Sequence, residues 1–191
     1  MIICKSERLS IRAWKESDRD LFFEINSDPK VMEFFPFRRS RPEADALFDR
    51  VGRGIAETGL GFFAIALKGN DRPIGFCGLA LTDLEPHFPK GTVEIGWRLS
   101  TPFWGKGYVT EAASELLRYG FEEKGLSEIV SFAVGANTRS TAVMQRIGMR
   151  RDPSRDFDHP RVPVDHPALV RHVLYAIRAE EWRAQHPKAE K

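Results

Sequence analysis

The sequence TVEIGWRLSTPFWGKGYVTEA, from Thr92 to Ala112, decides the fold of the chain. Its first part, Thr92–Leu99, alternates apolar and polar side chains, which predicts a β-strand. Its last part opens a stretch with apolar residues three or four apart, which predicts an amphipathic helix. The segment Gly105–Gly107 lies at the start of that helix. Because glycine lets the backbone approach a ligand and the first N–H groups of a helix lack intrahelical acceptors, this turn is suited to phosphate or pyrophosphate.

The alternative is a turn that needs glycine only for its backbone shape, and the pattern alone leaves both interpretations open. A dinucleotide-binding fold is disfavoured because Thr110 stands where the third glycine of G-x-G-x-x-G would be. The chain contains no G-x-x-x-x-G-K-[ST] sequence, which excludes a Walker A loop. A nucleotide-binding regulator is therefore disfavoured as well.

Working outward from this segment, hydrophobic periodicity predicts the other elements. Strands are expected at Arg8–Trp14, Phe62–Leu67, Ile74–Leu81, Ile129–Val134 and Val170–Ile177, with a hairpin turn over residues 68–73. Helices are expected after a cap at Ser17 or Asp18, from Pro42 to Glu57, after Gly107, and after a cap at Asn137. The proline-rich segment Asp152–Leu169 is expected to be a loop. This order predicts an α/β (α+β) fold, with a single mixed, mostly antiparallel central sheet flanked by helices on both faces.

Length and composition limit the class of protein. The 191 residues predict one domain, 1–191, with a polar C-terminal tail from about residue 179. The 29 Lys and Arg against 27 Asp and Glu give a net charge of +2, which argues against nucleic acid as a partner. No apolar run approaches the ~18 residues of a membrane span, so no membrane partner is expected. Two cysteines without a CxxC pair and histidines without ligand spacing predict no metal. The early charges after Met1 argue against a signal peptide and predict a cytoplasmic protein.

Three motifs in this order resemble the GNAT N-acetyltransferase superfamily, in its RimJ/RimL-like branch. They are Glu94-Ile95-Gly96-Trp97, Trp104-Gly105-Lys106-Gly107-Tyr108, and Asn137-x-x-Ser140-x-x-x-Met144-x-x-Ile147-Gly148-Met149. The resemblance implies the GNAT fold and acetyl-CoA as the donor, with CoA as product and no metal. One departure is Pro102, which stands where the superfamily usually has Gln or Arg before the first glycine.

The resemblance also implies which residues contact acetyl-CoA. The pyrophosphate would lie on the turn at Gly105–Tyr108, and the pantetheine arm between the strands at Thr92–Leu99 and Ile129–Val134. Asn137 is a good helix N-cap and, by the resemblance, also contacts the pantetheine arm. The full set of expected acetyl-CoA-binding residues is Trp97, Leu99, Trp104, Gly105, Lys106, Gly107, Tyr108, Val109, Thr110, Asn137, Arg139 and Ser140.

Acetyl transfer to an amine requires a base for the amine and a proton or equivalent stabilisation for the departing thiolate. Alternation places Glu94 on the face of its strand opposite Val93 and Ile95. Similar sequences place a carboxylate here near the acceptor amine, so Glu94 is the expected base, the alternative being a solvated carboxylate. Many relatives carry a tyrosine acid where this chain has Met144. Ser140 is the nearest hydroxyl to replace it, unless it is an ordinary serine of the first helical turn.

The acceptor is expected to bind Glu94 and the aromatic residues Phe34, Phe35 and Phe37, which follow the first helix. The resemblance implies that this segment lines the acceptor pocket, the alternative being that the three rings belong to the core. The basic run Arg38–Arg41 could attract a carboxylate or phosphate. The sequence thus predicts an acetyl-CoA-dependent N-acetyltransferase acting on a primary amine of a small molecule, a peptide or a protein N-terminus. It is expected to be a monomer or homodimer. The alternative is a non-catalytic acyl-CoA-binding or sensor module, which would need neither Glu94 nor Ser140.

Overall fold

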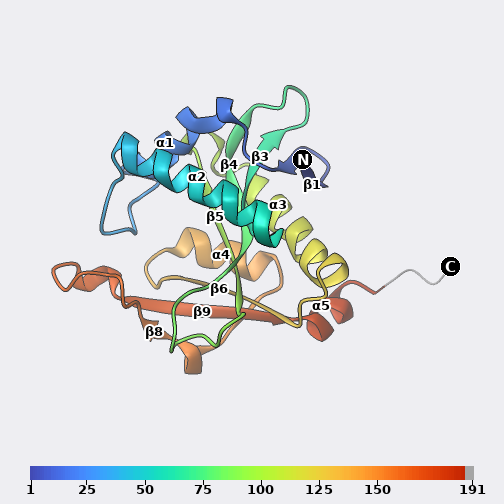
Figure 1. Ribbon diagram of the computed structural model, residues 1–191. Helices are drawn as coiled ribbons and strands as arrows, with labels where there is room; N and C mark the ends of the chain where they lie inside the picture. Colours follow the sequence, from blue (N-terminus) through green and yellow to red (C-terminus); the bar gives the residue numbers. More distant parts are fainter. Residues whose placement is uncertain (188–191) are drawn as a thin grey trace. The chain divides into compact units, whose positions relative to one another are not determined.

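A computed structural model of the chain describes residues 1–187 (Figure 1). These residues form two compact units. The first unit comprises Met1–Ala80 and Ile95–Leu116; the second comprises Leu81–Glu94 and Leu117–Lys191, described as far as residue 187. The fold is α/β with a mixed, mostly antiparallel sheet, as the sequence predicts.

The first unit contains consecutive strands that pair in sequence order. Neighbours from β1 to β4 are antiparallel, and the register places Leu9 opposite Leu67 and Phe63 opposite Cys77. The predicted hairpin is confirmed. The elements that lie wholly or largely in this unit are β1 (Ile2–Lys5), β2 (Leu9–Arg12), α1 (Arg19–Ser27), α2 (Arg41–Thr58), β3 (Gly61–Leu67), β4 (Pro73–Leu81), β5 (Val93–Leu99) and α3 (Tyr108–Arg118).

The second unit is built around one long antiparallel pair, β6 with β9. The short strands β7 and β8 also pair with β9, and the start of β5 joins β6 in parallel, with Glu94 opposite Val130. Its elements are β6 (Glu128–Val134), α4 (Thr138–Arg146), β7 (Arg150–Arg151), β8 (Phe157–Asp158), β9 (Arg171–Arg178) and α5 (Ala179–Gln185), preceded by a π-helical turn over Tyr119–Glu123.

Local sequence explains where the helices begin and end. The backbone N–H of Ser40 donates to the Glu43 carboxylate at 2.8 Å, which forms a capping box at the start of α2. Gly59, with φ of 69°, ends α2 in the left-handed conformation that glycine adopts without strain. At α4 the Asn137 side chain accepts the Ser140 N–H at 3.1 Å, so the predicted N-cap is confirmed.

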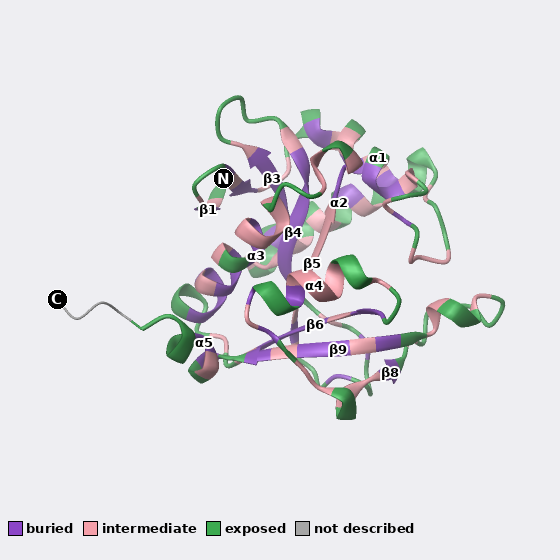
Figure 2. Cartoon of the chain, turned by 180° about the vertical axis from the view of Figure 1, so that it is seen from behind, coloured by how far each residue is buried: buried purple, intermediate pink, exposed green. Residues whose placement is uncertain are grey.

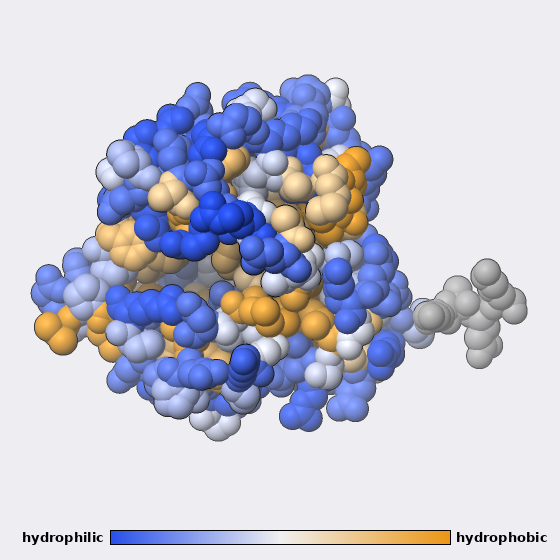
Figure 3. All heavy atoms as spheres, viewed as in Figure 1, coloured by the Kyte–Doolittle hydropathy of each residue, from blue (hydrophilic) through white to orange (hydrophobic). Residues whose placement is uncertain are grey.

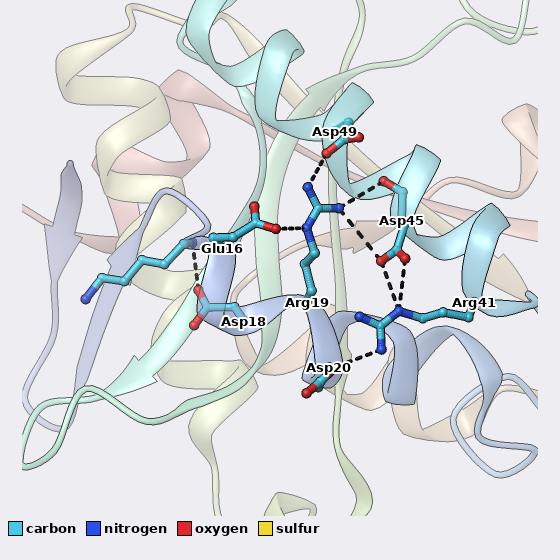
Figure 4. Close-up of polar contacts among 8 residues, drawn as sticks. Glu16, Asp18, Arg19, Asp20, Arg41, Asp45 and Asp49 are labelled. Atoms are coloured by element: carbon cyan, nitrogen blue, oxygen red, sulfur yellow. Dashed lines mark hydrogen bonds and ion pairs between the residues drawn. The ribbon is translucent and has the colours of Figure 1, made fainter.

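Ion pairs join α1 to α2 (Figure 4). Arg19 of α1 pairs with Asp49 of α2 at 2.6 Å, and Arg41 of α2 pairs with Asp20 of α1 at 2.7 Å. The pair of Arg41 with Asp45, at 3.0 Å, lies within α2. Each exposed pair contributes little, typically up to about 1 kcal/mol, although pairs that form a network contribute more than isolated ones. The upper region of Figure 3, where α1 and α2 lie, accordingly presents mostly hydrophilic side chains.

Each unit has its own apolar interior, and the buried strands β3, β4 and β9 stand out in Figure 2. In the first unit the rings of Trp14, Phe22 and Phe48 pack edge to face, with centroids 4.9–5.8 Å apart. In the second, a cluster of Leu84, Phe88, Val130, Phe157 and Leu174 is buried. Cys77 is fully buried, as its position in an apolar run predicts, and burial raises the pKa of its thiol.

Three segments differ from the sequence-based expectations. Ile2–Lys5 forms β1, a strand too short to show a clear period. The expected loop Asp152–Leu169 contains β8 and buries Phe157. The polar segment from about residue 179 begins with α5, which buries Ala179 and Trp182 on one side. In all three cases the structure depends on pairing or packing with distant residues, which local pattern does not report.

Candidate active site

The turn before α3 has the backbone that a phosphate site requires. Gly105 and Gly107 adopt φ of 72° and 77°, values that side-chain-bearing residues rarely adopt. A Cβ at Gly105 would meet nothing within 4 Å, and one at Gly107 would meet only the Arg8 guanidinium at 3.5 Å. The first helical hydrogen bond beyond the turn runs from the Glu111 N–H to the Gly107 carbonyl. The open, exposed turn and the helix N-terminus behind it therefore fit a pyrophosphate.

Arg8 and Glu111 hold the turn in place, and neither is identified by the sequence motifs. The Arg8 Nη1 donates to the Lys106 carbonyl at 3.0 Å, and its guanidinium lies 4.5 Å from the centre of the Tyr108 ring. The Glu111 carboxylate accepts bonds from the Arg8 side chain at 2.6 Å, the Arg8 N–H at 2.7 Å and the Ser6 hydroxyl at 2.7 Å. Burial raises the pKa of Glu111, but these bonds together outweigh it, so the pKa is lowered and the carboxylate stays ionised.

The other donor-site candidates of the first unit lie around this turn or on β5. The Trp104 indole donates to the Leu99 carbonyl at 2.7 Å, which ties the turn to the end of β5. The Lys106 side chain is exposed, with its ammonium 5.6 Å from the Phe103 ring centre. Leu99 is buried, whereas Trp97, Tyr108, Val109 and Thr110 are half-buried.

Glu94 is a half-buried carboxylate in the second unit. Within residues 1–187 its side chain makes no hydrogen bond and no ion pair, so no partner stabilises the ionised form. Burial is the main cause that raises the pKa of Glu94 to about 7, and the negative charge of Asp83 adds to the rise. Arg161, which pairs with Asp83 at 2.7 Å, opposes the shift. A carboxyl with a pKa near neutrality can both take and release a proton under physiological conditions.

Asn137 and Ser140 lie together at the start of α4. The Asn137 oxygen is used by the cap, whereas its amide nitrogen makes no hydrogen bond within the described chain. The half-buried Ser140 hydroxyl likewise makes none within residues 1–187. Both groups can therefore donate to a ligand. Arg139 is exposed on the same turn, and Met144, in the place of the superfamily's tyrosine, is buried.

The aromatic candidates for acceptor binding lie between α1 and α2. Phe34 and Phe35 are half-buried and Phe37 is exposed. Of the basic run beside them, Arg41 is paired with carboxylates, and Arg38 donates to the carbonyls of Phe35, Phe37 and Pro29. Arg39 differs, because its buried Nε has no hydrogen-bond partner.

Comparison with known proteins identifies the family. The profile described as "Acetyltransferase (GNAT) domain" matches residues 8–150, which include β5, the glycine turn and α4. The chain belongs to the GNAT acetyltransferase family. The resemblance seen in the three motifs is thereby confirmed, and a GNAT acetyltransferase uses acetyl-CoA as donor and an amine as acceptor.

Several relatives span nearly the whole GNAT chain. The uncharacterized N-acetyltransferase YnaD of Bacillus subtilis is 32% identical over 178 residues, which cover 93% of this chain and 97% of that protein. An Aspergillus fumigatus protein named FsC-acetyl coenzyme A-N(2)-transacetylase is 30% identical, with coverage of 94% and 78%. The crystal structure of a GNAT-family acetyltransferase from Bacillus anthracis aligns with a TM-score of 0.77 at 30% identity, covering 94% and 99%.

Two findings concern other classes of site in this acetyltransferase. No helix within residues 1–187 is long and apolar enough to cross a membrane. The same residues contain no group of three or more His, Cys, Asp and Glu side chains arranged to hold a metal ion.

Proposed function

We propose that the chain transfers the acetyl group of acetyl-CoA to a primary amine of a small molecule, a peptide or a protein N-terminus by direct attack of the amine. The observation that carries this proposal is Glu94, a half-buried carboxyl without a protein partner and with a pKa of about 7. A protein that only binds acyl-CoA has no use for such a group. A pKa near the working pH is what a general base requires.

The roles follow from the chemistry of each group. When bound, acetyl-CoA supplies an acetyl group activated as a thioester. The turn at Gly105–Tyr108 and the Asn137 amide hold the donor. Glu94 accepts the proton that the amine loses as its nitrogen bonds to the acetyl carbon. As the carbon–sulfur bond breaks, the Ser140 hydroxyl donates to the sulfur and regains its proton from solvent. We further propose that residues 1–191 act as one domain, as a monomer or homodimer.

An acceptor screen tests this function. The panel contains free amino acids, short peptides, polyamines and aminoglycosides, and release of the CoA thiol is measured for each. The name of the N(2)-transacetylase relative states acetyl transfer from acetyl coenzyme A to a nitrogen, which supports testing amines as acceptors. Acetyl-CoA binding without thiol release from any acceptor would favour the sensor module instead.

Ser140→Ala is expected to lower turnover on the order of 10²-fold while leaving acetyl-CoA affinity nearly unchanged, because a positioned proton donor acts as the thiolate departs. Water can recover part of the loss. Turnover and the dissociation constant are measured on the same preparation. Thr141→Ala is the matched control, because it also removes a hydroxyl from α4, one that donates to the Thr138 carbonyl. Wild-type turnover in Ser140→Ala would show that Ser140 is an ordinary residue of the first helical turn without a catalytic role.

A further inference from the structure

Among the buried and half-buried arginines of the first unit, Arg98 and Arg39 have no carboxylate partner. The others do have one. The buried Arg12 pairs with Asp18 at 2.6 Å, and Figure 4 shows Arg19 and Arg41 within their acidic partners. Within the described residues, Arg98 and Arg39 form no ion pair. Their positive charges are the exception in a unit that otherwise neutralises its half-buried guanidinium groups.

Arg98 lies on β5 among aromatic rings. Its guanidinium is 4.1 Å from the centre of the Phe35 ring and 5.6 Å from that of Phe76. Its Nη1 donates to the side-chain oxygen of the fully buried Asn26 at 2.6 Å. Stacking and one neutral hydrogen bond fix the direction of this side chain, yet they leave its charge without a counter-ion.

Arg39 is anchored to the same asparagine. Its backbone N–H donates to the Asn26 carbonyl at 3.0 Å, and its guanidinium lies 4.8 Å from the Phe37 ring centre. Phe35 and Phe37 are the rings against which the two guanidinium groups lie, and their centres are 6.2 Å apart. The Arg39 Nε is buried without an acceptor. An unpaired buried donor is costly, and an acceptor from a ligand would remove that cost.

The electrostatics agree with this geometry. Burial and then the charge of Arg39 lower the pKa of Arg98 to about 9. Burial and the charge of Arg50 lower the pKa of Arg39, with Glu43 opposing them. Glu43 is already engaged by Ser40 at the start of α2. Burial and a nearby positive charge therefore disfavour the charged form of each guanidinium group, and a bound anion would favour it again.

We propose that Arg98 and Arg39 bind an anionic group, a carboxylate or a phosphate, on the acceptor amine. The inference rests on the proposed function and narrows its acceptor to small amines that also carry an acidic group. A guanidinium donates two parallel hydrogen bonds to such an oxyanion. The rings of Phe35 and Phe37 offer apolar contact beside it. Polyamines and aminoglycosides, which are polycationic, would be repelled.

Matched acceptor pairs test the charge preference. One set pairs α-amino acids with their amides, and another pairs aminoethyl phosphate with ethanolamine, so that the two anion sources are separated. We expect kcat/KM to be at least tenfold higher for the anionic member in one of the sets, mainly through KM. Equal or better use of the neutral members in both sets, or turnover of polyamines alone, would overturn the inference and leave the acetyltransferase function standing.

Variants assign the preference to the two arginines. Arg98→Met and Arg39→Met are expected to remove most of the anionic-to-neutral ratio while acetyl-CoA affinity is retained. Arg39→Met provides the test if Arg98→Met does not fold. Arg53→Gln, which removes an exposed charge from α2, is the control and should keep the ratio. A retained ratio in Arg39→Met and in folded Arg98→Met would show a purely structural role and overturn the assignment. Absence of thiol release with every amine would instead contradict the proposed function.

Discussion

A Gly107→Glu variant is expected to bind acetyl-CoA at least tenfold more weakly than the wild type, a loss of about 1.4 kcal/mol or more. Gly107 opens α3 with φ of 77°, on an exposed turn whose N–H groups fit a pyrophosphate. A glutamate side chain at this position brings a negative charge to the place where the phosphates must lie. Like charges in contact disfavour binding, and the positive end of the helix dipole is then partly satisfied by the protein itself. Calorimetric titration with acetyl-CoA measures the effect.

Two control variants separate charge from backbone strain, because any side chain at a positive φ is strained by roughly 1–2 kcal/mol. Gly107→Asn places a neutral residue that tolerates the left-handed conformation, so its affinity should be reduced far less. Gly125→Glu makes the same substitution at a left-handed glycine, φ 64°, with nothing within 4 Å of its Cβ. It should bind acetyl-CoA like the wild type. Unchanged acetyl-CoA affinity in folded Gly107→Glu would show that acetyl-CoA does not bind at this turn.

Glu94→Gln is expected to lower turnover strongly near pH 7 and to leave acetyl-CoA binding nearly intact. Glutamine keeps the size of the side chain but cannot accept a proton from the amine. The base is the ionised carboxylate, and the pKa of Glu94 is about 7. Wild-type kcat/KM should therefore rise with pH through an inflection near 7, as the carboxyl loses its proton, and this inflection should be missing in the variant.

The size of the defect depends on pH and on the acceptor. An alkyl amine, with a pKa of roughly 10, is almost fully protonated at neutral pH, whereas an α-amino group, near 8, has a useful neutral fraction. The defect of Glu94→Gln should thus shrink as pH rises, and it should be smaller for α-amines. Equal rates of variant and wild type near pH 7 would contradict the assignment of Glu94 as the general base. A defect of the same size at high pH would indicate that Glu94 positions the acceptor.

The neighbours of Glu94 provide an internal control for this pH profile. The charge of Asp83 raises the pKa of Glu94 and that of Arg161 lowers it. Asp83→Asn should therefore move the inflection to lower pH, and Arg161→Gln should move it to higher pH. Both residues are exposed, so the shifts are small and decrease with added salt.

The sequence predicts the elements whose signals are local. The Gly-turn-helix segment, the hairpin of β3 and β4, and the Asn137 cap are all found where period and capping residues place them. Capping residues and glycines act on adjacent backbone, so one short window contains the information. The strand β1 was missed because it pairs with β2 rather than following a period of its own.

The candidate site was predictable only where a motif marks it. Gly107 and Asn137 belong to short patterns, but Glu111 is held by Arg8, a residue 103 positions earlier. The charge state of Glu94 depends on burial and on Asp83 and Arg161, which no spacing rule connects. The sequence could not show that Arg98 and Arg39 lack a carboxylate partner either. Of the three arginines in Arg38–Arg41, Arg41 pairs with carboxylates and Arg38 donates to carbonyl groups, and no local pattern separates Arg39 from these two. Long-range contacts decide these properties.

The hydrogen bonds that Ser6 and Arg8 donate to Glu111 affect where the boundaries of fragments of this chain should be placed. The family profile begins at residue 8, and a fragment trimmed to that boundary would retain both glycines of the turn. It would lose the Ser6 hydroxyl and leave Arg8 at a freely moving, charged end of the backbone. Weak binding of acetyl-CoA by such a fragment would then result from the lost support of Glu111, although the glycine turn itself is intact. Comparative work on relatives should therefore keep the residues ahead of the aligned region.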